Sequence, residues 1–286
     1  MEKNKSIEKL LLGKKVSVIS YDSGGAEVLS SFTKHYKAKY SFTVGGPAQK
    51  IFENKINNFK NLPLTKNLDN SDIVITGTGL DSDLEYEAIK YCKKNNKKVF
   101  SYIDHWINYK KRFIRRNKLL LPNELWVGDN DAKKIAKKNF KKIRIVLVPN
   151  PYWIQSINNF KKIKKIASNT ILFVSSNNDR SNNKRINDQV IFTKFLKYLK
   201  NKDIKKIIIR RHPSEKNNKF KLKFYKKNFI KFDNNKNLLS SLSSCSKIFG
   251  HNSMALVIGK LCGLDTFHIN IDGKLSIPKK FIDHII

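Results

Sequence analysis

Few acidic residues balance the many basic ones in this sequence: its 286 residues include 23 Asp and Glu against 58 Lys and Arg. The resulting net charge of +35 excludes a surface that repels anions. Three origins fit this charge: a compositional drift toward Lys, Asn and Ile, an anionic membrane surface or polymer substrate, or a nucleic acid. The lysines are scattered along the whole chain and form no basic arm, which favours drift.

Cysteines and long apolar runs are also scarce. The three cysteines, Cys92, Cys245 and Cys262, form no CxxC pair and have no His at metal-ligand spacing, so we expect buried free thiols in a reducing compartment. No apolar stretch approaches the roughly 18 residues of a membrane span, and the run Leu10 to Leu12 is too short for a signal-peptide core. We therefore expect a cytoplasmic protein, with peripheral contact to the inner face of an anionic membrane left open.

Short β-branched runs alternate with helical patterns along the first half, which is typical of parallel α/β units. Each run is almost continuously apolar, as in a sheet that is covered on both faces. We expect strands at residues 16–20, 40–44, 72–76, 99–103, 124–128 and 143–148, and helices at residues 25–35, 47–54, 83–94 and 130–140.

The second half repeats this rhythm. We expect strands at residues 170–176, 205–213, 229–233, 247–252 and 265–271, and helices at residues 186–200, 238–244, 253–261 and 280–286. Between the halves, two prolines flank an asparagine in VPNPYW (148–153), which predicts a hinge because neither strand nor helix should continue there. The fold class is therefore α/β, with Rossmann-like doubly wound domains at residues 1–149 on the acceptor side and 150–286 on the nucleotide side, facing a ligand cleft.

The stretch IIIRRHPSE (207–215) gives the first functional signal. Three β-branched residues run directly into Arg210, Arg211 and His212, and packing gives no reason for this at a strand end. A second strand ends in FGHNSMALVIGKLCG (249–263), where Asn252 or Ser253 is a plausible helix N-cap.

These two strand ends together predict a pocket for a phosphodiester or pyrophosphate. The free amides of a first helical turn attract anions, and the small residue Ser253 lets a phosphate approach closely. By itself each signal is weak, since His-Pro occurs by chance and Asn-Ser is first of all a cap. The predicted phosphate-binding set is Arg210, Arg211, Asn252, Ser253, Met254, Ser175 and Ser176.

The order of these motifs resembles a known family. Arg-Arg-His-Pro, then a serine at a strand-to-helix turn and Gly-Lys-x-x-Gly closing the helix, is similar to the second domain of GT-B glycosyltransferases of the bacterial polysialyltransferase and CDP-glycerol glycerophosphotransferase kind. In that family both motifs hold the phosphate of the nucleotide donor. The resemblance implies His212 as phosphate contact or general acid, Arg210 or Arg211 as a supporting cation, and Ser253 as the serine-motif hydroxyl. The paired-acid-glycine motif expected in the first half is missing.

In the first half, Asp22 of SYDSGGAEV and Asp104 of YIDHW both follow predicted strands. Either carboxylate could deprotonate an acceptor hydroxyl, and either could be an ordinary polar cap. The glycines after Asp22 leave room for a substrate but lack the GxGxxG spacing of a dinucleotide site. The predicted acceptor-side residues are Gly24, Gly25, Gly77, Thr78, Gly79, His105 and Trp106.

Two further patterns remain open at this point. Asp81 and Asp83 formally match a metal-binding acidic motif, but acidic residues are ordinary in a first helical turn, so we expect no metal. The stretch DHWINYKKRFIRR (104–116) interleaves aromatic and basic residues. It suits a platform for acidic sugar rings, a platform for single-stranded nucleic acid, or a loop anchored by its aromatic side chains.

The leading prediction is a metal-independent GT-B-type glycosyltransferase without a cofactor. It would move a sugar or sugar-acid from a nucleotide-sugar donor, CMP- or CDP-linked rather than UDP-linked, to a capsule-like surface polysaccharide or a lipid-linked glycan. Asp22 or Asp104 would act as base and His212 would assist the leaving phosphate. The alternatives are a nucleotide-sugar epimerase or hydrolase on the same fold, and a nucleic-acid-binding protein, which leaves RRHP and GHNSMA at strand ends unexplained.

Overall fold

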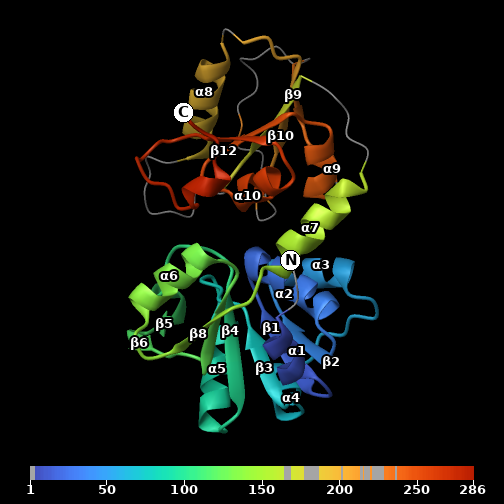
Figure 1. The fold of residues 1–286 in the computed structure, drawn as a ribbon, viewed down its shortest axis with the longest axis vertical. Helices are drawn as coiled ribbons and strands as arrows, with labels where there is room; N and C mark the ends of the chain where they lie inside the picture. Colours follow the sequence, from blue (N-terminus) through green and yellow to red (C-terminus); the bar gives the residue numbers. More distant parts are fainter. Residues whose placement is uncertain are drawn as a thin grey trace. The chain divides into compact units, whose positions relative to one another are not determined.

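The structure is a computed structural model that describes residues 4–163, 169–176, 187–200, 202–212, 215, 220, 229–235 and 237–286. The chain divides into two compact units, Met1–Ile154 and Gln155–Ile286. Each unit has its own parallel six-stranded sheet, coloured blue to green in the first and yellow to red in the second (Figure 1). This confirms the predicted fold class of two Rossmann-like α/β domains.

The first sheet has the strand order β2-β1-β3-β4-β7-β8. Its strands are β1 (Lys15–Ser20), β2 (Lys39–Val44), β3 (Ile73–Thr76), β4 (Lys98–Ile103), β7 (Glu124–Val127) and β8 (Arg144–Leu147). A small antiparallel pair, β5 (Ile114–Arg115) and β6 (Lys118–Leu119), follows the short helix η1 (Lys111–Phe113). After β2 the chain crosses back over β1 to reach β3, so the order reverses between β1 and β3, and in such sheets ligands bind outside the carboxyl ends of the strands at this reversal.

Helices cover both faces of the first sheet, because successive strand side chains point to opposite sides. On one side, Val16 and Val18 of β1 belong to a core shared with helices α1 (Lys5–Leu11), α2 (Ser23–His35) and α3 (Pro47–Lys55). On the other side, Ser17 donates to the Asn67 side chain of α4 (Leu64–Asp69) at 2.7 Å. Helices α5 (Leu84–Lys94) and α6 (Asn130–Asn139) complete the domain.

The second sheet has the strand order β11-β10-β9-β12-β13-β14. Its strands are β9 (Thr170–Val174), β10 (Lys206–Arg210), β11 (Ile230–Phe232), β12 (Lys247–Gly250), β13 (Asp265–His268) and β14 (His284–Ile285). Here the order reverses between β9 and β12. The helices are α7 (Pro151–Lys161), which holds the division between the units, α8 (Asp188–Leu199), α9 (Leu238–Ser243), α10 (Met254–Leu261) and the short η4 (Lys279–Phe281).

Each domain has a separate aromatic-rich core. In the second domain Phe249 and Phe267, on the neighbouring strands β12 and β13, stack with ring centroids 4.3 Å apart. Phe173, Phe192 and Phe195 join them in the same buried cluster. Burying several phenylalanines around one sheet provides the apolar area that stabilises a domain of this size.

Most predicted elements are found within a few residues of their expected bounds, but one prediction was wrong and the helices α1, α4 and α7 were not predicted. Residues 280–286, predicted as a helix, form η4 and then β14, which pairs with β13 because β-branched residues suit a sheet edge. The segment 148–153 was predicted as a break through which neither strand nor helix continues; β8 ends before it at Leu147, and α7 starts within it at Pro151. Proline suits the first helical position, since the amide that it lacks has no helical partner there.

Candidate active site

Polar side chains gather at the carboxyl ends of β1, β3 and β4, where the order of the first sheet reverses. Asp22 lies two residues after β1 at the N-cap of α2, but its side chain makes no hydrogen bond to that helix. Its Oδ2 instead accepts the Leu80 amide, at 3.1 Å, from the loop after β3. Burial, together with the negative charges of Asp104 and Asp81, raises the pKa of Asp22 above its usual value.

Asp104 follows β4 directly and forms an ion pair with Arg112, Oδ1 to Nη1, at 3.0 Å. The side chains of both residues are largely buried, with 14% and 9% exposed. Arg112 Nη1 also donates to the carbonyl and hydroxyl oxygens of Thr78, at 3.0 and 2.9 Å. Arg112 therefore ties the loop after β3 to the end of β4 and neutralises Asp104.

The glycines of this region serve close packing. A Cβ atom on Gly24 would lie 2.1 Å from Asp104 Oδ2, so only glycine lets the start of α2 approach that carboxylate. A Cβ atom on Gly25 would lie 3.5 Å from the Cα of Gly77. The carbonyl of Gly79 accepts from Arg115 Nη2 at 2.9 Å. Gly24, Gly25, Gly77 and Gly79 thus let the loops at the strand ends pack closely around the carboxyl groups, and their role at an acceptor site stays a prediction.

Glu85 of α5 is a member of this cluster that sequence reasoning missed. Only 3% of the residue is exposed, and its Oε1 accepts the Tyr21 amide at 2.8 Å. Burial raises its pKa to about 7. Its burial could have been predicted from the sequence, because Glu85, Ala88 and Cys92 are spaced as on the buried face of a helix.

The aromatic residues after β4 anchor their loop. Trp106 is only 6% exposed, stacks on Trp153 with ring centroids 5.9 Å apart, and donates through Nε1 to Asp129 at 2.9 Å. Tyr109 and Phe113 are buried as well. The interpretation as a platform for sugars or bases was wrong for these side chains, since packing against the domain covers their faces.

His105 lies next to the carboxyl cluster. Its Nδ1 accepts the Trp106 amide at 2.9 Å. Burial lowers the pKa of His105 to about 4, despite the opposing charge of Asp104, so the ring is neutral at pH 7. A neutral ring with an accepting Nδ1 carries its proton on Nε2.

In the second domain, the end of β9 connects both motif segments. The Ser175 hydroxyl accepts the His212 amide at 2.9 Å and donates to Glu215. The Ser176 hydroxyl donates to the His251 carbonyl after β12. The segments RRHP and HNS, distant in sequence, are thus joined through two serines at the reversal between β9 and β12. Pro213 lies outside the described residues.

The two motif arginines differ in their surroundings. Arg210 pairs with Asp233 at 2.5 Å and donates to the Ser241 hydroxyl at 3.0 Å. Burial opposes ionisation of Asp233, but hydrogen bonds from Ser241, Asn235 and Arg210 lower its pKa below the usual value. Arg211 is exposed, with its guanidinium 5.7 Å from the Phe232 ring. Arg211 is therefore better placed than Arg210 to meet an incoming anion, and both roles remain predictions.

The turn before α10 and the first turn of that helix hold the predicted residues Asn252, Ser253 and Met254. Asn252 adopts a left-handed backbone with φ of 48°, and its Oδ1 accepts the Ser276 amide at 2.9 Å. Ser253 caps the helix by accepting the Ala255 amide at 3.3 Å, and Met254 is its first residue. Free amides of a first helical turn attract anions, and the phosphate site at this turn stays a prediction.

Two buried histidines that sequence reasoning did not select flank this turn. His251 and His268 stack with ring centroids 5.1 Å apart. The Nδ1 of His251 lies 2.8 Å from the Ile269 carbonyl, and burial lowers the pKa of His268 to about 4. Their positions, directly after β12 and at the end of β13, could have indicated them from the sequence, because strand ends are where such sheets bind ligands.

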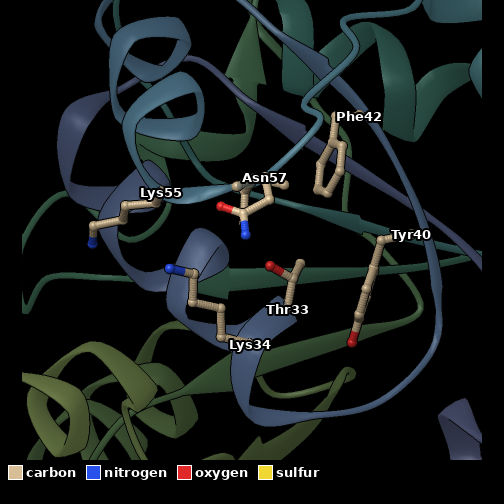
Figure 2. Close-up of a pocket in the computed structure, with 7 residues that line it drawn as sticks. Thr33, Lys34, Tyr40, Phe42, Lys55 and Asn57 are labelled. Carbon is tan, nitrogen blue, oxygen red and sulfur yellow. The ribbon is translucent and has the colours of Figure 1, made fainter.

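A pocket of about 360 Å³ opens elsewhere on the first domain (Figure 2). Helix α2 starts at the carboxyl end of β1 and runs back along the sheet, so its last turn lies away from the carboxyl cluster. The pocket is lined from that last turn, from β2 and from the end of α3 by Thr33, Lys34, Tyr40, Phe42, Lys55, Ile56 and Asn57.

Neither a metal-binding cluster nor a membrane-spanning helix is present in the described residues. No group of three or more His, Cys, Asp or Glu side chains in these ranges is placed to hold a metal ion. Every helix in the described part of the chain is too short or too polar to cross a bilayer.

Comparison with known proteins identifies the fold. No family model and no curated protein sequence matches the chain. The UDP-GlcNAc 2-epimerase from Methanocaldococcus jannaschii is similar in structure, with a TM-score of 0.63 and 12% identity over 95% of this chain and 88% of that one. The chain has a GT-B-type fold.

Two transferase structures agree with this assignment. The kitacinnamycin glycotransferase has a TM-score of 0.54 and 11% identity over 94% of this chain and 82% of that one. The wall teichoic acid polymerase TagF has a TM-score of 0.51 and 13% identity over 91% and 71%. At such identities the likeness shows the GT-B-type fold alone, because one fold supports many activities.

Proposed function

We propose that the protein is a glycosyltransferase that moves a sugar or sugar-acid from a nucleotide-activated donor to a surface polysaccharide or lipid-linked glycan. The carboxyl cluster at the reversal of the first sheet carries this proposal. Asp22, Glu85 and Asp104 meet where a Rossmann-like sheet binds its ligand, and acceptor activation needs a carboxylate there.

Asp22 is the better base of the two carboxylates predicted from the sequence. Asp104 is neutralised by Arg112, whereas Asp22 has a raised pKa that makes it a stronger proton acceptor. As the acceptor oxygen attacks the anomeric carbon, Asp22 takes the hydroxyl proton. The bond from that carbon to the donor phosphate breaks, and the nucleotide leaves with the electron pair.

The leaving phosphate belongs to the second domain in this proposal. The amides at the start of α10, the Ser253 hydroxyl, His212 and Arg211 would share its charge, so the transfer is assigned no metal and no cofactor. The resemblance of the RRHP and serine motifs supports CMP- or CDP-linked donors over UDP-linked ones.

A nucleotide-sugar epimerase or hydrolase is the second candidate. The observation that favours it is the higher TM-score of the UDP-GlcNAc 2-epimerase, 0.63 against 0.54 and 0.51 for the two transferases. Such an enzyme would use the same carboxyl cluster without an acceptor.

Incubation with CMP-, CDP- and UDP-linked sugars, with and without oligosaccharide acceptors, tests the proposal. We expect a product only when donor and acceptor are both present, and a thermal shift with nucleotide corresponding to about 2.7 kcal/mol at 100 times its dissociation constant. A new epimer or free sugar from donor alone would favour the second candidate. Steeply salt-dependent binding to nucleic acid without any turnover would favour the nucleic-acid alternative.

Two variants assign the roles. Asp22→Asn should keep nucleotide binding and lose transfer, because only the proton acceptor is removed. His212→Ala should remain folded and lose about 100-fold in turnover if the imidazole assists the leaving phosphate. Full transfer by both variants would overturn the proposed roles.

A further inference from the structure

Glu85 is a buried carboxyl group that the proposed transfer does not use. Its Oε1 accepts the Tyr21 amide, and its Oε2 has no hydrogen-bond partner among the described residues. Hydrogen bonding from the backbone of Glu85 itself, Tyr21 and Gly79 opposes the effect of burial on its pKa only in part. The buried Ser20 hydroxyl close to it also has none within those ranges. An unpartnered buried carboxylate oxygen is costly, so the environment favours the neutral acid.

Asp22 and Glu85 meet across a single glycine. A Cβ atom on Gly79 would lie 3.0 Å from Asp22 Cγ and 3.1 Å from Glu85 Oε1, so both carboxyl groups border the space that a side chain at position 79 would fill. Asp22 accepts the amide of Leu80, which follows Gly79 in the chain, and Glu85 accepts the amide of Tyr21, which precedes Asp22. These two hydrogen bonds hold the two carboxyl groups close to each other.

The charges around the pair do not neutralise it. Asp81 and Asp104 add negative charge near Asp22. Two arginines of this region form ion pairs with other carboxylates, Arg112 with Asp104 and Arg115 with Asp83. On α5 itself, Glu87 is exposed and pairs with Lys90. Two ionised carboxylates would therefore repel each other with only the partial compensation that the charge of Arg112 gives Asp22, which favours retention of one proton.

We propose that Asp22 and Glu85 form a carboxyl pair that holds one proton at neutral pH, with Glu85 as the protonated positioning residue and Asp22 as the ionised base. Only the role of Asp22 as base rests on the proposed function. Glu85 keeps the proton because it is the more deeply buried and has an unpartnered oxygen, whereas Asp22 lies in the field of Arg112. During transfer Asp22 receives the proton of the acceptor hydroxyl, and the carboxyl group of Glu85 keeps its own proton.

The experiment is a carbon-13 NMR titration of the glutamate carboxyl groups in the full chain. The chain has eight glutamates, and Glu85→Gln identifies the signal of Glu85, with Glu87→Gln on the same helix as control. We expect a midpoint near pH 7 for Glu85, against 4.5 for an ordinary glutamate, and a lower midpoint in Asp22→Asn. A Glu85 midpoint below pH 5, or one that Asp22→Asn leaves unchanged, would overturn the pair. Should Glu85→Gln not fold, Glu85→Asp removes the same glutamate signal and identifies it.

The pH profile of transfer separates positioning from a merely structural role. Glu85→Gln, which stays neutral at every pH, should lose the decline that ionisation of Glu85 causes above pH 7, so that its ratio of transfer at pH 8 to transfer at pH 6 exceeds that of the wild type. An equal loss at all pH values would contradict the positioning role. If no nucleotide sugar reacts while the NMR midpoints behave as expected, the proposed function fails and the carboxyl pair stands.

Discussion

At the residue scale, the carboxyl cluster is assembled from groups whose burial costs free energy. Backbone amides hold Asp22 and Glu85, and a guanidinium holds Asp104. Where burial is not fully compensated, it shifts the pKa of a group in the direction that favours the uncharged form. Shifts of this kind are concentrated at functional sites. The same burial makes the stability of the first domain depend on pH.

Glu85→Gln should stabilise the protein at alkaline pH. The pKa of Glu85 in the fold, about 7, lies above its ordinary 4.5, so its favourable contribution is complete below pH 4.5 and is lost as pH rises through 7. Above pH 7 the buried charge costs about 3 kcal/mol, which the amide avoids. Urea unfolding measured from pH 5 to pH 8 should show that the unfolding free energy of the variant rises relative to that of the wild type. The control Glu87→Gln should keep a constant difference from the wild type over the same pH range. Parallel stability curves would contradict this.

Arg112→Met should be strongly destabilising. It leaves the Asp104 carboxylate buried without its partner and removes two hydrogen bonds to Thr78, a loss of about 3–5 kcal/mol in unfolding free energy. The matched control is Arg144→Met. Arg144 pairs with Glu124 but is 75% exposed, so its loss should cost at most about 1 kcal/mol. Equal effects in chemical denaturation would show that Arg112 is not held as described.

At the element scale, the start of α2 decides the geometry of the cluster. The helix begins directly after the β1 turn, and its first glycines bring backbone against the ends of β3 and β4. A close approach of this kind needs residues without a side chain. The spacing of Asp22 and Asp104 is therefore a property of how α2 packs.

Gly24→Ala should reverse the usual effect of alanine in a helix. Helix propensity alone favours alanine by up to about 1 kcal/mol, but here the new methyl group would overlap the Asp104 carboxylate. We expect a net loss of about 1–3 kcal/mol from overpacking, and weaker transfer because Asp104 must move. Ser23→Ala, one residue earlier, is the control and should change the unfolding midpoint little. A stabilised Gly24→Ala protein would contradict the packing.

At the scale of the whole molecule, each unit has its own core. The cluster of the first unit includes Val148 and Tyr152, and Trp153 stacks on Trp106, so the first turn of α7 completes that core. Separate cores permit each domain to fold as a unit. The net charge of +35 is likewise carried by the whole molecule, since lysines occur in most elements.

A fragment that ends at Lys161 should therefore fold alone, whereas one that ends at Pro149 should be less stable, by about 3–5 kcal/mol for the loss of a buried tryptophan. Thermal unfolding followed by near-ultraviolet circular dichroism would report both. An unfolded longer fragment would show that the first domain depends on the second.

The sequence by itself predicted the main strands of the two sheets, most of the helices that connect them, and the strand-end positions. These elements follow from local signals, because apolar period and turn residues act over a few neighbouring positions. For the same reason Asp22, Asp104 and Ser253 could be placed at strand ends before any strand order was known. The sequence did not predict the helices α1, α4 and α7 or the short pair β5 and β6.

Tertiary structure alone decided which of these ends meet. The reversals between β1 and β3 and between β9 and β12 depend on strand order, which no local pattern encodes. The pairing of Arg210 with Asp233 joins the end of β10 to the residue after β11. The burial of Trp106 and the approach of Glu85 and Asp22 to Gly79 likewise depend on residues from different elements. Burial and charge pairing depend on what packs around a side chain, so one glutamate on a helix could become a proton-holding group only once the domain had folded around it.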